Sequence, residues 1–303
     1  MHSYITYGLV LHSDVPLPEL FPEGGTKAPD ALIQIGTVGR YPTEGSSTRG
    51  CFLATEEEAY FHWAEYGTCL VRKGTTIIVE PSPQAEERML RLVILGVAMG
   101  VLLHQRGILT LHASAVRIHG EVVAFVANKK GGKSTTAAAL HALGHAVVAD
   151  DIVAVDTSCE QSRVIPGFPQ LKIWPDVAEA LGKTVEEMPQ LHPKLNKLAH
   201  VTDYDFSLLP LPLKRIYILR QDSLRSSERV ETQSIFLELM RHSYAVRFLG
   251  SVGATPSHFQ RIMKVANHVP VSVLNRPALL GELPDLARWI EQQAMTPEMA
   301  DAQ

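Results

Sequence analysis

The sequence is organised around one segment, Ala127-Asn128-Lys129-Lys130-Gly131-Gly132-Lys133-Ser134-Thr135. The apolar run Glu121–Val126 precedes it and predicts a buried strand, and the Ala-rich run from 136 to 143 that follows predicts a helix. A strand, a glycine-rich turn with Gly-Lys-Ser, and a helix are together typical of a phosphate-binding loop. In such a loop, consecutive backbone N–H groups surround an anion, and the helix N-terminus adds the positive end of its dipole.

The same segment predicts a site for ATP and Mg²⁺. The Lys133 ammonium is expected to reach the β- and γ-phosphates, and the Ser134 hydroxyl to bind Mg²⁺. Ala127 stands where the motif has its first glycine, and an alanine fits there only if its φ is negative. The alternative is an ordinary strand–turn–helix connection without a ligand. The residues expected to contact the nucleotide are Asn128, Lys129, Lys130, Gly131, Gly132, Lys133, Ser134 and Thr135.

Two neighbouring acids, Asp150 and Asp151, follow the apolar run Ala146–Ala149 shortly after the loop. This arrangement suits phosphoryl transfer, because one carboxylate can bind Mg²⁺ while the other accepts a proton from an incoming hydroxyl. Burying both acids without a metal or a donor would be costly. We expect Asp150 to be the base and Asp151 to be the metal partner together with Ser134, and the reverse order stays open. The alternative is a pair of solvated turn residues.

Composition limits the classes of protein. The chain has 303 residues, of which 46% are hydrophobic and 20% charged, which is ordinary for a globular protein. Its net charge of −4 argues against a general nucleic-acid binder, and its three cysteines are too few for a disulfide framework or a zinc cluster. Residues 1–4 lack the basic start of a signal peptide, and the apolar segment 92–103 is too short to span a bilayer. We therefore expect a cytoplasmic protein with no membrane or nucleic-acid partner.

Two domains are expected. Residues 1–83 contain short β-like runs separated by turns, beginning with a strand over 4–11, and predict an antiparallel β-rich domain that ends at Pro81-Ser82-Pro83. A buried helix over 84–105 is expected to join it to the second domain, residues 84–303. In that domain, the runs 110–116 and 121–126 flank His119-Gly120 and predict a hairpin.

The chain resembles the bacterial HPr serine kinase/phosphorylases in three motifs that occur in the order of that family. They are Leu111-His112, the loop from Ala127 to Ser134, and the segment from Gly144 to Asp151. The resemblance implies an α/β fold, a P-loop kinase core of the HPr kinase/PEP carboxykinase-like type with a smaller β-rich N-terminal domain. It also implies ATP and Mg²⁺ as cofactors, and a homo-oligomer, since the HPr kinases are oligomers. Four catalytic residues follow from it, namely His112, Lys133, Asp150 and Asp151.

His112 is expected to hydrogen-bond one of the two acids and set its orientation, the alternative being a core histidine whose bonds are satisfied. Lys129 and Lys130 flank the loop and are expected either to contact ATP or to form a solvated loop tip. Three further cations, Lys197, Arg241 and Arg247, are candidates for stabilising the transferred charge, and an ordinary surface position is the alternative for each.

Softer motifs resemble the HPr-kinase-like proteins of lasso-peptide biosynthesis clusters. They are Tyr7-Gly8-Leu9, Pro166-Gly167-Phe168-Pro169 and Asn275-Arg276-Pro277. This resemblance implies an ATP-dependent serine kinase whose partner is a ribosomal precursor peptide phosphorylated at its C-terminal serine. The Gly-rich signature that HPr kinase/phosphorylases carry after the acids was not found, which favours a kinase without the reverse reaction.

Two other functions are compatible with the same residues. A small-molecule kinase acting on free serine or a sugar would share every catalytic residue, but it would hardly require the N-terminal domain, which a peptide could use through strand addition. A non-catalytic nucleotide-dependent interaction module would explain Ala127 but would not need a base. The sequence leaves the acceptor unidentified.

Overall fold

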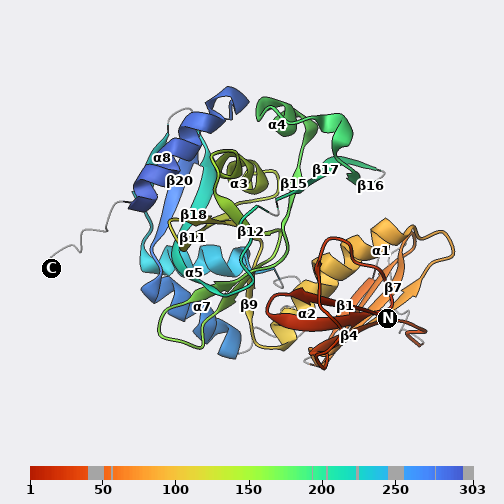
Figure 1. The fold of residues 1–303 in the computed structure, drawn as a ribbon. Coiled ribbons are helices and arrows are strands. Elements are labelled where there is room, and N and C mark those ends of the chain that lie inside the picture. Colours follow the sequence, from red (N-terminus) through yellow and green to blue (C-terminus); the bar gives the residue numbers. More distant parts are fainter. Residues whose placement is uncertain are drawn as a thin grey trace.

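The structure is a computed structural model that describes residues 1–39, 51–55, 57–192, 194–202, 204–222, 225–244, 256–276 and 278–295. It is a mixed α/β protein with a central sheet, an N-terminal sheet and a small third sheet (Figure 1). Within these residues, no helix is both long and apolar enough to cross a membrane.

Among the described residues, the central sheet has nine strands. Six of them lie in the order β12-β10-β11-β18-β20-β19, and the beginning of the long strand β18 also pairs with the row β14-β13-β9. The bounds are β9 Leu109–Leu111, β10 Ala113–Ile118, β11 Glu121–Val126, β12 Ala146–Asp150, β13 Val153–Asp156, β14 Arg163–Ile165, β18 Leu211–Gln221, β19 Ser226–Arg229 and β20 Val271–Arg276.

Helices cover both faces of this sheet (Figure 1). They are α3 (Lys133–Ala142) and α8 (Leu283–Met295) on one face, and α5 (Thr232–Arg241) and α7 (Pro256–His268) on the other. Strand β11 alternates between the two: Val122 and Ala124 pack with α5 and α7, whereas Val123 and Phe125 pack with α3 and α8. A strand buried on both faces is therefore continuously apolar. The strand, loop and helix expected over 121–143 are confirmed, with the helix beginning at Lys133.

The directions of the strands create the site. Strand β10 is antiparallel to both β11 and β12, and β11, β18 and β20 run parallel. The carboxyl ends of β11, β12, β18 and β20 and the amino end of β10 therefore meet at one edge of the sheet. In open α/β sheets, ligands bind beyond the carboxyl ends of the strands.

The N-terminal sheet has eight strands in the order β3-β1-β2-β4-β8-β7-β6-β5. The bounds are β1 His2–Thr6, β2 Leu9–Ser13, β3 Phe21–Pro22, β4 Ala31–Ile35, β5 Cys51–Ala54, β6 Glu58–Trp63, β7 Gly67–Arg72 and β8 Thr76–Pro81. The single strand expected over 4–11 is wrong, because Tyr7 and Gly8 have φ of 50° and 69° and form a tight hairpin turn between β1 and β2. The expected antiparallel arrangement is wrong in part, since β4 pairs parallel with both β2 and β8.

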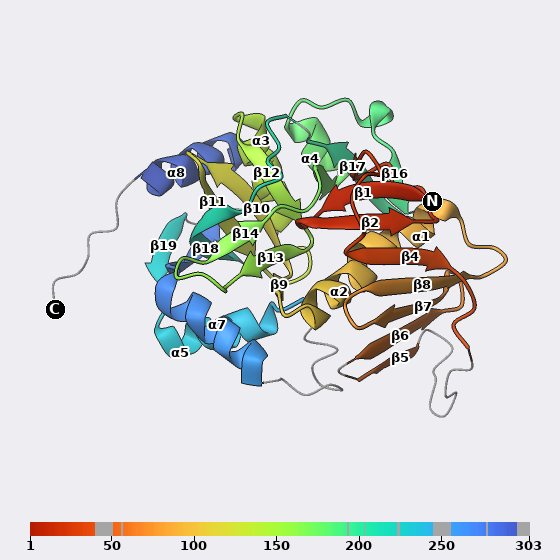
Figure 2. The same ribbon diagram turned by 60° about the horizontal axis from the view of Figure 1, so that its bottom comes forward.

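The helix expected over 84–105 packs on the N-terminal sheet (Figure 2). It consists of α1 (Glu87–Val93), the π-helical turn η1 (Ile94–Ala98) and α2 (Met99–Gln105). Its apolar side chains share one hydrophobic cluster with the N-terminal sheet and with Ile152, which follows the two acids. The domain limits of 1–83 and 84–303 stay a prediction.

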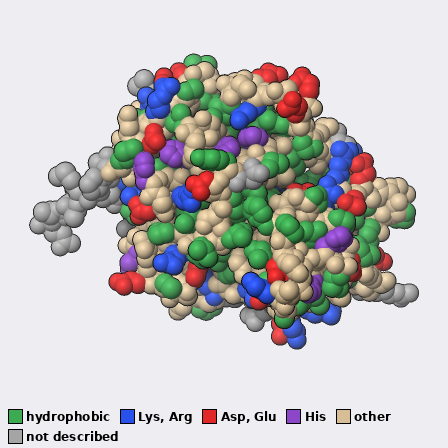
Figure 3. Space-filling model, in the orientation of Figure 1, with side chains coloured by type: hydrophobic (Ala, Val, Ile, Leu, Met, Phe, Trp, Pro, Cys, Tyr) green, Lys and Arg blue, Asp and Glu red, His purple; other side chains and the backbone are tan. Residues whose placement is uncertain are grey.

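The third sheet bridges the two larger ones. It has the order β15-β17-β16, with β15 Gln170–Ile173, β16 Gln190–His192 and β17 Leu195–Val201, and it is accompanied by α4 (Pro175–Ala180) and the short 3₁₀ turns η2 (Val185–Glu187) and η3 (Leu280–Glu282). The Tyr66 hydroxyl lies 2.7 Å from His192 Nε2, and Lys194 forms an ion pair with Glu65. On the face seen in Figure 3, acidic and basic side chains are interspersed.

Candidate active site

The glycine-rich loop connects β11 to α3 with two residues in the left-handed region. Lys130 has a φ of 66° and Gly132 a φ of 91°, whereas Ala127 has a negative φ, as an alanine at the first motif position requires. A Cβ on Gly132 would lie 1.7 Å from Arg276 Nη2, so only glycine permits this approach. Arg276 ends β20, and its guanidinium lies against the loop, 3.4 Å from the Gly131 carbonyl oxygen.

The N-terminus of α3 suits an anion. Gly132 is its N-cap, and no side chain of the described residues caps it by a hydrogen bond, so its first N–H groups remain available. Lys133 is only 7% exposed, and its Nζ donates to the Ala127 carbonyl oxygen at 2.9 Å. Burial lowers the pKa of Lys133, and the opposing charges of Asp150 and Asp151 favour its ammonium form. The buried Lys133 ammonium thus lies at the loop, where it could contact a bound phosphate.

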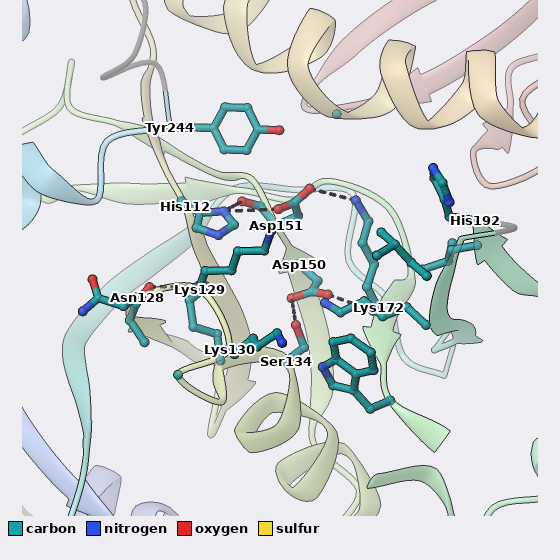
Figure 4. A pocket seen from close by; sticks show the side chains of 18 of the residues that line it. His112, Asn128, Lys129, Lys130, Ser134, Asp150, Asp151, Lys172, His192 and Tyr244 are labelled. Atoms are coloured by element: carbon teal, nitrogen blue, oxygen red, sulfur yellow. Dashed lines mark hydrogen bonds and ion pairs between the residues drawn. The ribbon is translucent and has the colours of Figure 1, made fainter. Parts of the chain in front are cut away.

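Asp150 lies beside the loop serine. Ser134 Oγ donates to Asp150 Oδ1 at 2.9 Å, and the backbone N–H of Lys172 donates to Oδ2 at 2.8 Å (Figure 4). Ser114 Oγ donates to the same Oδ1 at 2.5 Å. Ser114 reaches it because it lies directly opposite Asp150 in the pairing of β10 with β12. The carboxylate is buried, with three donors oriented at it, and a hydroxyl and a carboxylate oxygen stand side by side at the N-terminus of α3.

Asp151 has different surroundings. Its φ is 76°, which an L-residue rarely adopts and which marks local strain. Its carboxylate lies 2.8 Å from Lys172 Nζ and 3.2 Å from His112 Nδ1 (Figure 4). Burial alone would raise the pKa of Asp151, but the Lys172 ammonium and the His112 hydrogen bond hold it well below its usual range. Asp151 is thus ionised at neutral pH.

His112 acts on Asp151 through one ring nitrogen. Its Nδ1 lies 3.1 Å from the backbone carbonyl oxygen of Asp151 as well as 3.2 Å from its carboxylate. Both neighbours are acceptors, so Nδ1 must carry a hydrogen. The backbone N–H of His112, which lies between β9 and β10, donates to the His242 carbonyl oxygen at 2.7 Å and so holds the backbone that carries the ring. The expected contact between His112 and one of the acids is present, and the acid is Asp151.

These residues line one cavity of about 1350 Å³. The cavity contains every residue predicted for catalysis or nucleotide binding, from His112 through the loop to Asp151, and also Lys197 and Arg241. Arg247 lies outside the described residues. Lys130 and Lys197 have their ammonium nitrogens 5.9 Å and 5.5 Å from the centroid of the Trp174 ring. The described lining includes seven cations and three acids, an excess that suits a polyphosphate: Lys129, Lys130, Lys133, Lys172, Lys197, Arg241 and Arg276, against Asp150, Asp151 and Asp176.

Sequence reasoning missed four residues of the site. Lys172, Ser114, Arg276 and Tyr244 reach it from different strands and a helix end, through pairings between segments distant in sequence. Lys172 alternates with the buried Leu171 and Ile173, as a polar residue of any half-buried strand does, so its position gave no distinct signal. Ser114 gave none either, and Arg276 stood in the motif Asn275-Arg276-Pro277 without a role of its own.

The residues present fit a nucleotide with Mg²⁺. Mg²⁺ in phosphoryl-transfer sites is usually held by one or two protein oxygens, substrate phosphates and water rather than by an all-protein cage. Among the described residues, no group of three or more His, Cys, Asp and Glu could hold a metal alone, whereas Ser134 and Asp150 supply the oxygen pair that such a site needs. Neighbouring lysines and the uncapped helix N-terminus suit the phosphates.

No protein-family model matches the chain, and neither does any curated protein. Among solved structures, it is similar to the Hpr(Ser) kinase/phosphatase from Coxiella burnetii, with 14% sequence identity over 60% of this chain and 91% of that chain and a TM-score of 0.31. A likeness at this level carries no argument about fold or activity. Those conclusions rest on the geometry described above.

Proposed function

We propose that the protein is an ATP-dependent kinase that transfers a phosphoryl group to the hydroxyl of a serine. The observation that carries this proposal is the pair of acids at the phosphate loop, one hydrogen-bonded to the loop serine and the other ionised beside a lysine and a histidine. Phosphoryl transfer depends mainly on positioning and on neutralising charge, and Lys133, the loop N–H groups and Mg²⁺ are suited to both tasks.

The contacts favour the reverse of the roles expected for the two acids. Asp150 shares its Oδ1 with the Ser134 hydroxyl, so Asp150 and Ser134 together would hold Mg²⁺. Asp151 lies away from that pair, and its ionised carboxylate is available to orient or accept the proton of the incoming hydroxyl. His112 and Lys172 would keep that carboxylate in place.

The acceptor we propose is a peptide, and in particular the C-terminal serine of a lasso-type precursor. Small-molecule pockets usually enclose roughly 300–1,000 Å³ for one ligand, and the cavity of about 1350 Å³, which would hold ATP as well, leaves space for an acceptor beside the nucleotide. The N-terminal sheet, which a small acceptor would not need, contributes one side of this cavity. A kinase for free serine or a sugar remains the second candidate, because the same catalytic residues would serve it.

Mass spectrometry tests the proposal. A lasso-type precursor peptide ending in serine, free serine and a hexose are each incubated with the protein, ATP and Mg²⁺, with Lys133→Ala as the inactive control. We expect phosphate on the serine of the peptide and none with the variant. Phosphate only on a small alcohol would transfer the proposal to the second candidate, and tight ATP binding without transfer to any acceptor would point to a nucleotide-dependent binding module.

A further inference from the structure

The end of the cavity opposite the loop has no part in the chemistry described so far. It is lined by the aromatic wall, which we define as Phe52, Phe61, Trp63 and Tyr66 of the N-terminal sheet. The charged side chains of the cavity belong to the loop, to the strands β12, β15, β17 and β20 with the residue after β12, and to the helices α4 and α5. The described lining residues of the N-terminal sheet and of the helix packed on it include no Lys, Arg, Asp or Glu: Phe52, Phe61, His62, Trp63, Tyr66, Met89, Leu92, Val93, Gly96 and Val97.

The rings of the wall pack against one another in a defined arrangement. Phe52 of β5 lies directly opposite Phe61 of β6, with ring centroids 5.0 Å apart, and Phe61 stacks on Trp63 at 5.7 Å with an interplanar angle of 2°. Phe61 and Trp63 are two residues apart on one strand and so face the same side of the sheet. Tyr66 lies 6.2 Å from Trp63, and its hydroxyl is held by His192. Phe61 is buried, whereas Phe52, Trp63 and Tyr66 are half-buried.

Short contacts connect the wall side of the cavity to the proposed base. The π-helical turn η1, which packs beside the wall, carries Gly96, and a Cβ there would lie 3.6 Å from the Tyr244 hydroxyl. At Gly100, one turn later, a Cβ would lie 2.5 Å from the Tyr244 ring, so glycine is required. The Tyr244 ring is 5.9 Å from the ring of His112, which contacts Asp151. The helix and Tyr244 thus connect one side of the cavity to His112, and the wall and Asp151 line this same cavity.

We propose that the aromatic wall binds an apolar or aromatic side chain next to the phosphorylated serine of a peptide acceptor. This inference rests on the proposed kinase function and names the acceptor class more closely. An aromatic surface on the side of the cavity whose described lining carries no Lys, Arg, Asp or Glu selects an apolar group, because burying that group on it removes apolar area from water while a charged group would lose its hydration. The wall thus provides the selection, and the acids provide the chemistry.

Equilibrium binding of short peptides tests the inference without turnover. Hexapeptides carry alanine in place of the acceptor serine and Trp, Leu, Gly or Asp on either side of it, and calorimetry measures their affinity for the protein with ADP and Mg²⁺. We expect a Trp peptide to bind about tenfold more tightly than the Gly and Asp peptides. Trp63→Ala should remove this preference. Phe21→Ala should keep it, because Phe21 is an aromatic residue of the same sheet outside the cavity.

Further variants and the serine peptides distinguish a misfolded variant, a failure of the wall proposal and a failure of the kinase proposal. Trp63→Gln serves if Trp63→Ala does not fold by circular dichroism, and Trp63→Phe should retain part of the preference. Equal affinities for the Trp and Gly peptides, or a preference that survives both Trp63→Ala and Trp63→Gln, would overturn the inference. Serine peptides phosphorylated equally whatever their neighbour would overturn it as well and leave the kinase intact. A preference for the Trp peptide without any phosphorylation would support the binding of an apolar side chain by the wall and would contradict the proposed kinase activity.

Discussion

Different interactions stabilise the loop end of the cavity and the aromatic wall. At the loop end, polar groups meet at fixed distances, and Lys130 and Asp151 adopt φ values that cost conformational energy. At the aromatic wall, half-buried rings lie on a regular sheet and extend its hydrophobic core into the cavity. The loop end has a strained backbone and recognises charge, which suits the proposed phosphoryl transfer. The aromatic wall has a relaxed backbone and non-directional contacts, which suit the proposed selection of an apolar acceptor side chain. Variants should therefore affect turnover at one end and acceptor choice at the other.

A large loss of steady-state turnover is expected from Lys133→Ala, which removes the buried ammonium from the loop end. Turnover should fall by about 10²–10³-fold, because a preorganised cation opposite developing phosphate charge is lost. Steady-state ATP consumption with a serine peptide measures this. Lys27→Ala, an exposed lysine outside the cavity, is the matched control and should be unchanged. Near-normal turnover by Lys133→Ala would show that the loop end does not determine turnover.

Asp150→Asn should separate metal binding from the rest of the loop end. Its carboxylate is bonded to Ser134, so the amide should raise the Mg²⁺ concentration needed for half-maximal rate by about tenfold. A magnesium titration at saturating ATP measures the change. Asp285→Asn, on the surface of α8 beside Arg288, is the control. An unchanged magnesium requirement would return the metal role to Asp151.

Lys172→Met should shift the pH dependence of kcat/KM. The folded-state pKa of Asp151 lies below its usual range, so the carboxylate contributes stability above pH about 4, and this contribution is lost as the pH falls further. Without the Lys172 ammonium, the largest cause that lowers the pKa of Asp151 is lost while burial still raises it, so the acid limb of kcat/KM should move to higher pH. Lys172→Arg should keep the wild-type limb. A limb that does not move in Lys172→Met would show that Asp151 is not the titrating base.

The smallest effect is expected where the third sheet meets the wall. Tyr66→Phe keeps the ring and removes the hydroxyl that lies 2.7 Å from His192. The free energy of unfolding should fall by about 1 kcal/mol, and affinity for apolar peptides should stay the same. Urea unfolding measures the first, and Tyr204→Phe, whose ring is 66% exposed, is the control. A loss of peptide affinity in Tyr66→Phe would show that the wall binds through its hydroxyl.

The same contrast explains how much the sequence predicted. The loop and the two acids were predictable because a local motif, flanked by apolar runs, fixes strand, turn and helix within about thirty residues. Ser114 and Lys172 were not, because they lie 36 and 22 residues from Asp150 in sequence: Ser114 reaches it through the pairing of β10 with β12, and Lys172 through its backbone N–H on β15. The aromatic wall looks in sequence like any buried strand. The turn at Tyr7 was missed because its positive φ is supported by distant contacts, such as its N–H donating to the Pro166 carbonyl oxygen at 3.0 Å.

Single-turnover phosphoryl transfer is the most direct test of the central claim. Wild-type protein and Asp151→Asn are loaded with γ-labelled ATP and Mg²⁺, mixed with a serine peptide and quenched, while calorimetry measures ATP affinity for each. We predict unchanged ATP binding and a transfer rate that falls by about 10²–10⁴-fold in the variant, since only the base has been removed. Transfer at the wild-type rate by Asp151→Asn would contradict the account.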